Sequence, residues 1–214
     1  MEKLLAKSKE KKSRKVHAVG IGAGPIVEDE FGNYKIRAGQ LNGEFVARAF
    51  PKHSAKSQGL MAEAKGTSET EAIEALKSLL SERETNRAAA RRREAKSDLS
   101  VPTQEEFLEA LRQTNLSVAQ QSMLKAHALA GEDGLVAVSI MNAGGYKSQD
   151  AAIKALAKAG ILLADYIGLV LPESDKNRLE PALSVLGYQS IAETDGPLHL
   201  ILHKELRDAV RQTL

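Results

Sequence analysis

The sequence predicts an α+β protein: a small antiparallel sheet with one long helix, followed by a mostly helical, winged-helix-like domain. Three observations lead to this prediction. Short runs of alternating apolar and polar residues, separated by turn-forming residues, occupy the N-terminal third. Near residue 67 the apolar residues change to helical spacing. In the C-terminal half, several helix patterns precede two alternating runs around a turn at 195–197, which is the order of helices and hairpin in a winged helix.

The first predicted domain, residues 16–96, begins as a small sheet. Its strands are separated by turns at 31–33 and 41–43 and are expected at 16–21, 25–28, 34–38, 44–51 and 60–65. Thr67 or Ser68 is then the N-cap of a helix whose acidic first turn suits the helix dipole. Apolar residues at helical spacing form the face expected to cover the sheet, namely Ala72, Ile73, Leu76, Leu79 and Leu80. Helix formers continue to Lys96, so we expect a basic, solvated extension.

The second predicted domain, residues 103–214, follows a linker at 97–102. Thr103, Ser117 and Ser148 are expected N-caps. The helices are expected at 104–114, 118–130, 135–143 and 149–159, the last of them broken at Gly160. Two alternating runs, 183–192 and 198–203, predict a β-hairpin, and 204–214 is a terminal helix or tail.

Composition excludes several classes of function. The 214 residues are 43% apolar, enough to bury a core, and contain no cysteine, which excludes disulfide scaffolds, thiolate zinc sites and cysteine nucleophiles. The aromatic content of 4% argues against stacking platforms for single-stranded nucleic acid. No apolar run approaches the roughly 20 residues of a membrane helix, and residues 1–15 contain no apolar signal region. We therefore expect a cytoplasmic protein without membrane contact.

The net charge of +2 conceals two basic segments on an acidic body. Residues 1–15, a predicted basic arm, have a net charge of +5, residues 83–96 of +4, and residues 99–214 of −4. Basic segments of this kind suit phosphate backbones. The expected phosphate contacts are Lys11, Lys12, Arg14 and Lys15 of the arm and Arg87, Arg91, Arg92 and Arg93 of the second segment. The alternative is a solvated tail and a helix end that complements its own dipole.

No set of residues predicts catalysis or metal binding. The glycines at 20–24 resemble a dinucleotide-binding turn, but carboxylates at 28–30 and a further turn follow where that motif needs a helix, so a glycine-rich strand or bulge is expected. His199 and His203 are four residues apart on a predicted strand, about 13 Å and too far for one metal ion. His127 lies in a helix and is expected to be structural. We therefore expect no enzymatic activity, no cofactor and no metal.

The segment with the most functional content is 144–154. A tight turn and a short helix precede the helix that starts after Ser148, the arrangement in which a recognition helix enters the major groove. Lys147, Ser148 and Gln149 would contact base edges or phosphates, and Lys154 and Lys158 follow along the helix. The alternative is a small helical domain whose lysines only keep it soluble, which the negative charge of this half favours.

The C-terminal half resembles a domain found beside the HNH nucleases of McrA-like restriction systems. The resemblance is carried by residues 116–127, 144–148, Ala151-Ala152, Gly160 and 196–206, about half of the chain. The nuclease module is absent, because neither a zinc scaffold nor a His-Asn-His set can be matched. Where that family has Asn, Tyr and Gly after the Ala-Ala pair, this chain has Ile153, Ala155 and Leu156. The resemblance implies association with DNA, in phage defence or mobile elements, without cleavage.

The N-terminal half resembles the sheet-then-helix core of HicB-type antitoxins. Residues 43–51 and 64–72 carry this resemblance, which implies a partner-binding module. A double-stranded-RNA-binding domain fits less well, because it presents basic residues where Glu69 and Glu71 begin the helix.

Two functions follow from these patterns. The first is a DNA-associated accessory or regulatory protein that binds duplex DNA through its C-terminal domain, with support from the basic segments. The second is a protein-binding inhibitor, such as an antitoxin or anti-defence factor, that acts on a nucleic-acid enzyme. In either case the helix after Ser68 could pair with a copy in a homodimer, although its apolar stripe ends too early for a coiled coil.

Overall fold

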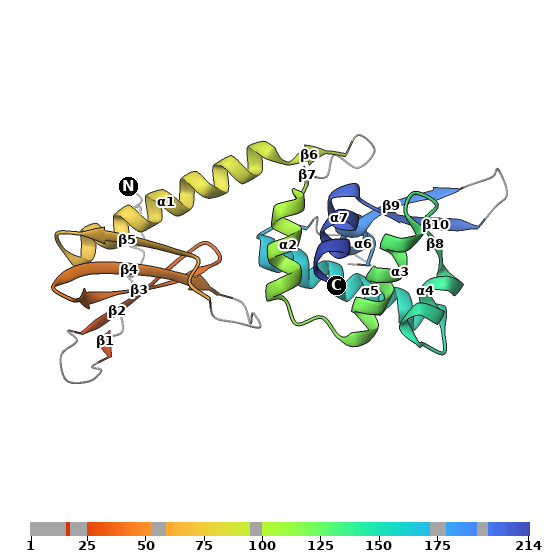
Figure 1. Cartoon of the computed structure of the whole chain (residues 1–214), viewed down its shortest axis with the longest axis horizontal. Coiled ribbons are helices and arrows are strands. Elements are labelled where there is room, and N and C mark those ends of the chain that lie inside the picture. The colour runs from red at the N-terminus through yellow and green to blue at the C-terminus, as the bar shows by residue number, and fades with distance from the viewer. Residues whose placement is uncertain (1–15, 18–24, 53–58, 95–99, 172–178, 192–196) are drawn as a thin grey trace, which may run out of the picture. The chain divides into compact units, whose positions relative to one another are not determined.

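In a computed structural model of the chain, residues 16–17, 25–52, 59–94, 100–171, 179–191 and 197–214 are described. The predicted α+β class is confirmed (Figure 1). The chain divides into two compact units, of which the first ends at Leu79 and the second consists mainly of Leu80–Leu214. The division falls inside the long helix, whereas the sequence pattern placed it at 97–102. The reason is that ion pairs attach the last turns of this helix to the second unit.

The first unit contains a five-stranded sheet whose strands follow chain order. The strands are β1 (Val16–His17), β2 (Ile26–Phe31), β3 (Tyr34–Leu41), β4 (Glu44–Pro51) and β5 (Ala62–Gly66). At the second predicted turn, Asn42 and Gly43 have φ values of 54° and 85°. Positive φ at two successive residues is typical of a tight hairpin turn and suits asparagine and glycine. The turn chemistry therefore fixes this hairpin, as the sequence predicted.

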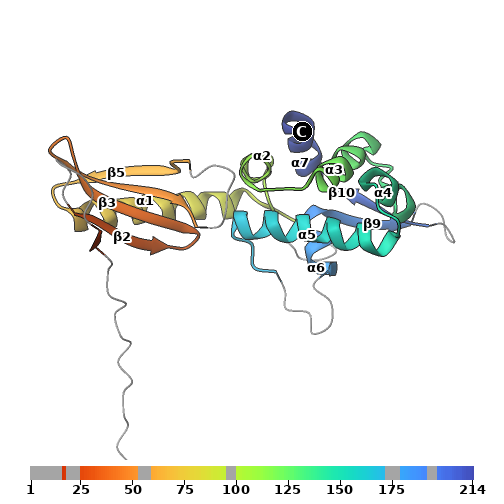
Figure 2. The ribbon, with the colours of Figure 1, turned by 90° about the horizontal axis from the view of Figure 1, so that it is seen from below.

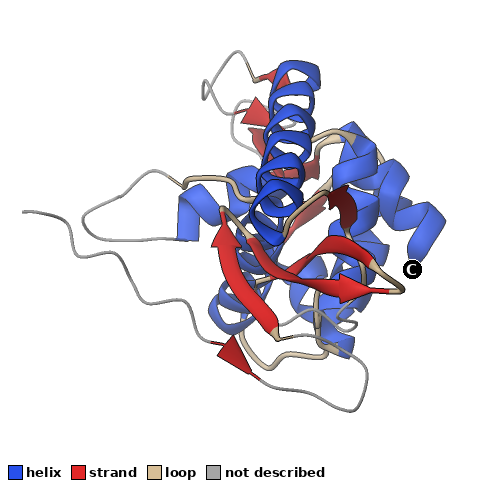
Figure 3. Cartoon of the chain, turned by 90° about the vertical axis from the view of Figure 1, so that its left-hand side faces the viewer, coloured by secondary structure: helices blue, strands red, loops and turns tan. Residues whose placement is uncertain are grey.

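The long helix α1 (Glu69–Ala90) lies against one face of this sheet (Figures 2 and 3). Alternate residues of β3, namely Tyr34, Ile36 and Ala38, are buried, as are Ile73 and Leu76 of α1. Alternation in the strand and helical spacing in α1 thus bury two apolar faces against each other. The prediction that the helix covers the sheet is confirmed. Leu79, which the sequence pattern placed on the covering face, is instead 44% exposed, because it lies at the edge of the apolar stripe.

The helix α1 ends at Ala90, earlier than the predicted extension to Lys96. A two-stranded ribbon follows, formed by β6 (Arg92–Arg93) and β7 (Ser100–Val101). Backbone pairing across this ribbon replaces the next helical turn. The segment read as a continuous basic helix is therefore part helix and part strand.

The second unit combines helices with a three-stranded sheet. Its further elements are α2 (Gln104–Gln113), α3 (Val118–Ala130), β8 (Leu135–Val136), α4 (Ala137–Gly144), α5 (Gln149–Ile167), α6 (Leu179–Leu186), β9 (Gly187–Ile191), β10 (Leu198–Leu202) and α7 (Lys204–Thr213). Thr103 and Ser117 form capping boxes at the starts of α2 and α3. Ser148 caps α5 through its hydroxyl oxygen. All three predicted N-caps are confirmed.

The sheet of the second unit has the strand order β8-β10-β9, with antiparallel pairs. The predicted hairpin is confirmed, but its first strand begins at Gly187 because 183–186 belong to α6. Short apolar runs fit helix and strand periods equally well, which explains this error. The order of elements matches the connectivity of a winged helix. Helix α3 is followed by β8, α4 and α5, and then by a hairpin whose second strand, β10, pairs with β8. Helix α6 is inserted before the hairpin.

The prediction that Gly160 breaks a helix is wrong, because α5 continues to Ile167. Gly160 is buried, and a Cβ atom there would lie 2.1 Å from the carbonyl oxygen of Ala182 in α6. Figure 2 shows α6 on one side of α5 and α2, α3 and α4 on the other. The glycine therefore permits close packing of two helices and does not end one.

Candidate nucleic-acid interface

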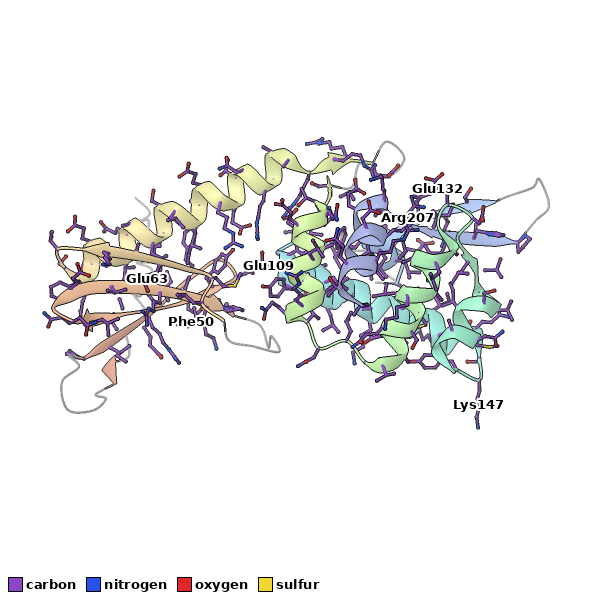
Figure 4. The ribbon with its side chains drawn as sticks, viewed as in Figure 1. Phe50, Glu63, Glu109, Glu132, Lys147 and Arg207 are labelled. Carbon is purple, nitrogen blue, oxygen red and sulfur yellow. The ribbon has the colours of Figure 1, made fainter. Side chains whose placement is uncertain are left out.

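The turn between α4 and α5 is where a helix-turn-helix protein presents its second helix to DNA. Gly145 ends α4 in the left-handed region, with φ 68°, and the Tyr146 N–H donates to the Met141 carbonyl at 3.0 Å. The Tyr146 ring lies beside Gly144, where a Cβ atom would come within 2.7 Å of it. This packing fixes the backbone of the turn, and Lys147 projects from it away from the unit (Figure 4).

The start of α5 carries the other residues that the sequence selected. The hydroxyl oxygen of Ser148 accepts from the Ala151 N–H at 3.3 Å, so this side chain caps the helix. Its hydroxyl hydrogen remains able to donate to an anion. Lys147 and Gln149 are exposed on either side of it. The positive end of the helix dipole points to the same place and favours a phosphate there.

Further along α5, exposed and buried residues alternate with helical spacing. Lys154 and Lys158 are exposed, whereas Ala152, Leu156 and Ala159 are fully buried. Asp150 is also exposed, one turn before Lys154. The N-terminal half of α5 therefore presents a mainly cationic face, interrupted by one carboxylate. The structure places Gln149, Lys154 and Lys158 on α5, with Lys147 and the N-cap Ser148 directly before it.

A hollow of about 360 Å³ lies beside this face. It is lined by Lys158, by Tyr146 of the turn and by Asn115 and Ser117 before α3, among others. Its polar groups include an ammonium, a phenol and an amide, all of which can donate to a phosphate oxygen. The cationic face of α5 thus continues into a concave surface.

The arginines of the second basic segment have a different environment. Arg91 forms a forked contact with the Glu106 carboxylate, with Nη2 to Oε1 at 2.6 Å and Nε to Oε2 at 3.2 Å. Only 1% of the Glu106 side chain and 10% of the Arg91 side chain is exposed. The same carboxylate accepts from the Thr103 N–H at 2.9 Å to complete the capping box. One buried glutamate therefore joins the end of α1 to the start of α2.

Glu109 is the next acidic residue on the same side of α2 (Figure 4). It accepts hydrogen bonds from Arg83 at 2.9 Å, from Arg87, and from the Tyr166 hydroxyl at 3.1 Å. Two guanidiniums from α1 and a phenol from α5 therefore share one carboxylate. This contact fixes the last turns of α1 within the second unit.

Arg92 also faces carboxylates. Its Nε is 3.0 Å from Glu205 Oε1, and its Nη1 is 3.0 Å from Glu94 Oε2. These hydrogen bonds raise the pKa of Arg92. Burial is the largest single influence on the Glu205 carboxyl and acts to raise its pKa. The bond from Arg92, a backbone hydrogen bond and the nearby positive charge together outweigh it, so the pKa is lowered.

The predicted nucleic-acid contacts at 147–158 and those at 87–93 therefore differ in their surroundings. Arg87, Arg91 and Arg92 are engaged by carboxylates of their own unit, and Arg93 is exposed. The sequence pattern did not reveal these partners, because no local signal links Arg91 to Glu106 or Arg92 to Glu205. Lys11, Lys12, Arg14 and Lys15 lie outside the described residues, as do the glycines at 20–24.

Two histidines of the second unit, His127 and His199, hydrogen-bond backbone carbonyls. His127 is fully buried and its Nδ1 hydrogen-bonds the Met123 carbonyl at 2.9 Å, while burial lowers its pKa. His199 Nδ1 bonds the Asp133 carbonyl at 2.8 Å. Within the described ranges, no group of three or more His, Asp or Glu side chains could hold a metal ion.

Comparison with protein-family models, with curated proteins and with solved structures finds no match for this chain. Among the helices of the described ranges, none has both the length and the apolar character needed to cross a membrane.

Proposed function

We propose that the chain is a non-enzymatic, DNA-associated regulatory protein that contacts duplex DNA with the N-terminal half of α5. One observation carries the proposal: the connectivity of a winged helix coincides with exposed lysines on the helix that this fold presents to the major groove. Lys147, Ser148 and Gln149 at the helix start contact base edges or phosphates. Lys154 and Lys158 bind the phosphate backbone. The basic arm at 1–15 adds sequence-independent affinity.

The test is fluorescence anisotropy with a mixed-sequence DNA duplex and an RNA duplex across a salt series. The proteins are the full chain, a chain starting at Val16, and a triple variant with Lys147→Ala, Lys154→Ala and Lys158→Ala. We expect DNA binding that weakens steeply with salt, because each phosphate contact releases counterions. The triple variant should lose about ten-fold or more in affinity at low salt, with a shallower salt dependence.

A matched variant removes the same charge elsewhere, with Lys35→Ala, Lys65→Ala and Lys204→Ala, from exposed positions outside α5. Its affinity should stay within about two-fold of the full chain. Equal losses in the two triple variants would show that only net charge matters and would refute a role for α5. Binding that vanishes without residues 1–15 would refute it as well.

A second proposal is a protein-binding inhibitor acting on a nucleic-acid enzyme. It is favoured by the pairing of Arg87, Arg91 and Arg92 with carboxylates, which reduces the free positive charge available to a phosphate backbone. Co-purification of the chain with one enzyme in a 1:1 complex that resists high salt, without duplex binding, would support this function.

A further inference from the structure

A cavity separate from the α5 face lies where α6, the hairpin and the start of α7 meet. Its volume is about 230 Å³. Apolar atoms dominate its wall, which includes Leu183, Leu200 and the Tyr188 side chain. Glu94 and Glu180 bring two carboxylates to the same wall. A cavity that is mostly apolar with a few convergent polar groups is the usual form of a small-molecule site.

His203 provides the strongest evidence that a ligand belongs in this cavity. Its side chain lines the cavity and is 1% exposed, and its Nδ1 atom has no hydrogen-bond partner. Its Nε2 lies 2.9 Å from the Ser184 carbonyl oxygen. Because a carbonyl only accepts, Nε2 must carry the proton, and in the neutral ring Nδ1 is a bare acceptor. A buried acceptor without a partner costs about 1 to 3 kcal/mol.

A carboxylate oxygen, which is also an acceptor, lies close to this nitrogen. His203 Nδ1 and Glu94 Oε2 are 3.8 Å apart, too far for a direct hydrogen bond and with no proton between them when the ring is neutral. Burial lowers the pKa of His203, and the charge of Arg92 adds to this. The hydrogen bond to the Ser184 carbonyl and the charges of Glu94 and Glu205 oppose it, but the net shift is downward, so the neutral ring predominates at pH 7. Arg92 Nη1 already donates to this Glu94 Oε2 at 3.0 Å, which leaves the carboxylate with further lone pairs. A positively charged group with two or more N–H donors can therefore satisfy His203 Nδ1 and give Glu94 a second donor.

We propose that this cavity binds a small organic molecule that carries a primary ammonium group on an apolar body. The ammonium donates to His203 Nδ1 and Glu94 Oε2, and the apolar body contacts Leu183, Leu200 and the Tyr188 ring. The second carboxylate, Glu180, adds to the preference for a cation. The proposal does not depend on DNA binding, because the two sites share no residue.

The experiment uses the full chain and benzylammonium as the probe, with benzyl alcohol as its neutral counterpart, measured by isothermal titration calorimetry. We expect saturable binding of benzylammonium at least ten-fold tighter than binding of benzyl alcohol. Comparable binding of the two probes would show an apolar hollow without ammonium recognition and would overturn the proposal. Absence of benzylammonium binding would do the same.

Two variants locate the site. Glu94→Gln keeps the shape of the side chain, removes its charge and should weaken benzylammonium binding at least ten-fold. The matched control is Glu205→Gln, because Glu205 also bonds Arg92 but does not line the cavity. It should leave binding within about two-fold, and equal losses in both variants would contradict the assignment.

A second measurement keeps the test decisive if Glu94→Gln does not fold. The ¹⁵N signal of His203 Nδ1 in the unmodified chain reports whether this nitrogen gains a donor. We expect it to shift on addition of benzylammonium, while the ring signals of the buried His127 stay unchanged. Calorimetric binding without a shift at His203 would place the ammonium elsewhere and refute the proposed site.

Discussion

The second unit carries two groups of cationic side chains that a charge count treats alike. The arginines at 83–92 are held by Glu106, Glu109 and Glu205. By contrast, Lys147 is exposed just before α5, and Lys154 and Lys158 are exposed on it. The guanidinium fork matches a carboxylate in two directions and is weakly hydrated, so arginine suits a partly buried pair. The lysine ammonium is strongly hydrated and remains at the surface. The contrast shows that chemistry and burial, more than net charge, decide which cations are available to a partner.

Among variants that separate the paired arginines from the exposed lysines, Arg91→Ala should have the largest effect on stability. The change leaves the buried carboxylate of Glu106 without its cation, which should lower the free energy of unfolding by about 3 kcal/mol. Urea unfolding of the full chain measures this loss. Arg112→Ala, at an exposed position of α2, is the control and should change stability by less than about 0.5 kcal/mol. A similarly small effect at Arg91 would show that its pair with Glu106 is not structural.

A smaller effect on stability is expected from a variant that weakens the pairing of the arginines, so that they resemble the exposed lysines. Glu109→Gln removes the charge that Arg83 and Arg87 share and should cost about 1 kcal/mol, because these side chains are about a quarter exposed. The change also removes one negative charge beside two guanidiniums, so affinity for the DNA duplex should rise about two- to five-fold at low salt. Anisotropy with the duplex measures this gain. Unchanged affinity together with lowered stability would show that the arginines serve only the fold.

A third effect concerns pH and separates the arginine pairs from the buried histidines. Burial lowers the folded-state pKa of His127 and His203 from 6.5, so the unfolded chain binds more protons once the pH falls below that value. Stability should be constant above about pH 7.5 and fall towards pH 5.5, by no more than about 1.4 kcal/mol per pH unit for each histidine. Arginine stays charged throughout this interval.

The variant His127→Gln isolates one of these contributions. Urea unfolding at about pH 7.5 and pH 5.5 should show a smaller difference in this variant than in the unmodified chain. An unaltered difference would assign the pH dependence to other groups. The side-chain hydrogen bond of His127 goes to the Met123 carbonyl and involves neither the arginines nor the lysines. The variant therefore tests the pH dependence without altering either group of cations.

Much of the fold could be predicted from local patterns. Thr103, Ser117 and Ser148 were recognisable as N-caps because capping depends on a few neighbouring residues. The turn at Asn42-Gly43 was recognisable because few residues adopt positive φ. Predictions failed where distant contacts decide the structure. Gly160 was read as a helix end, but the approach of Ala182 from α6 explains why a glycine is needed there.

The candidate site divides in the same way. Sequence alone determined the α+β class, the helix-turn-helix spacing and the position of lysines at the start of α5, because helical periodicity fixes which residues share a face. Only the tertiary structure decided that Arg91 meets Glu106, that Arg92 meets Glu205 and that His203 lines a cavity beside Glu94. These contacts join segments from different elements, and no local pattern encodes such a pairing. Charge and periodicity can be read from a sequence, but burial and partnership depend on how the chain packs.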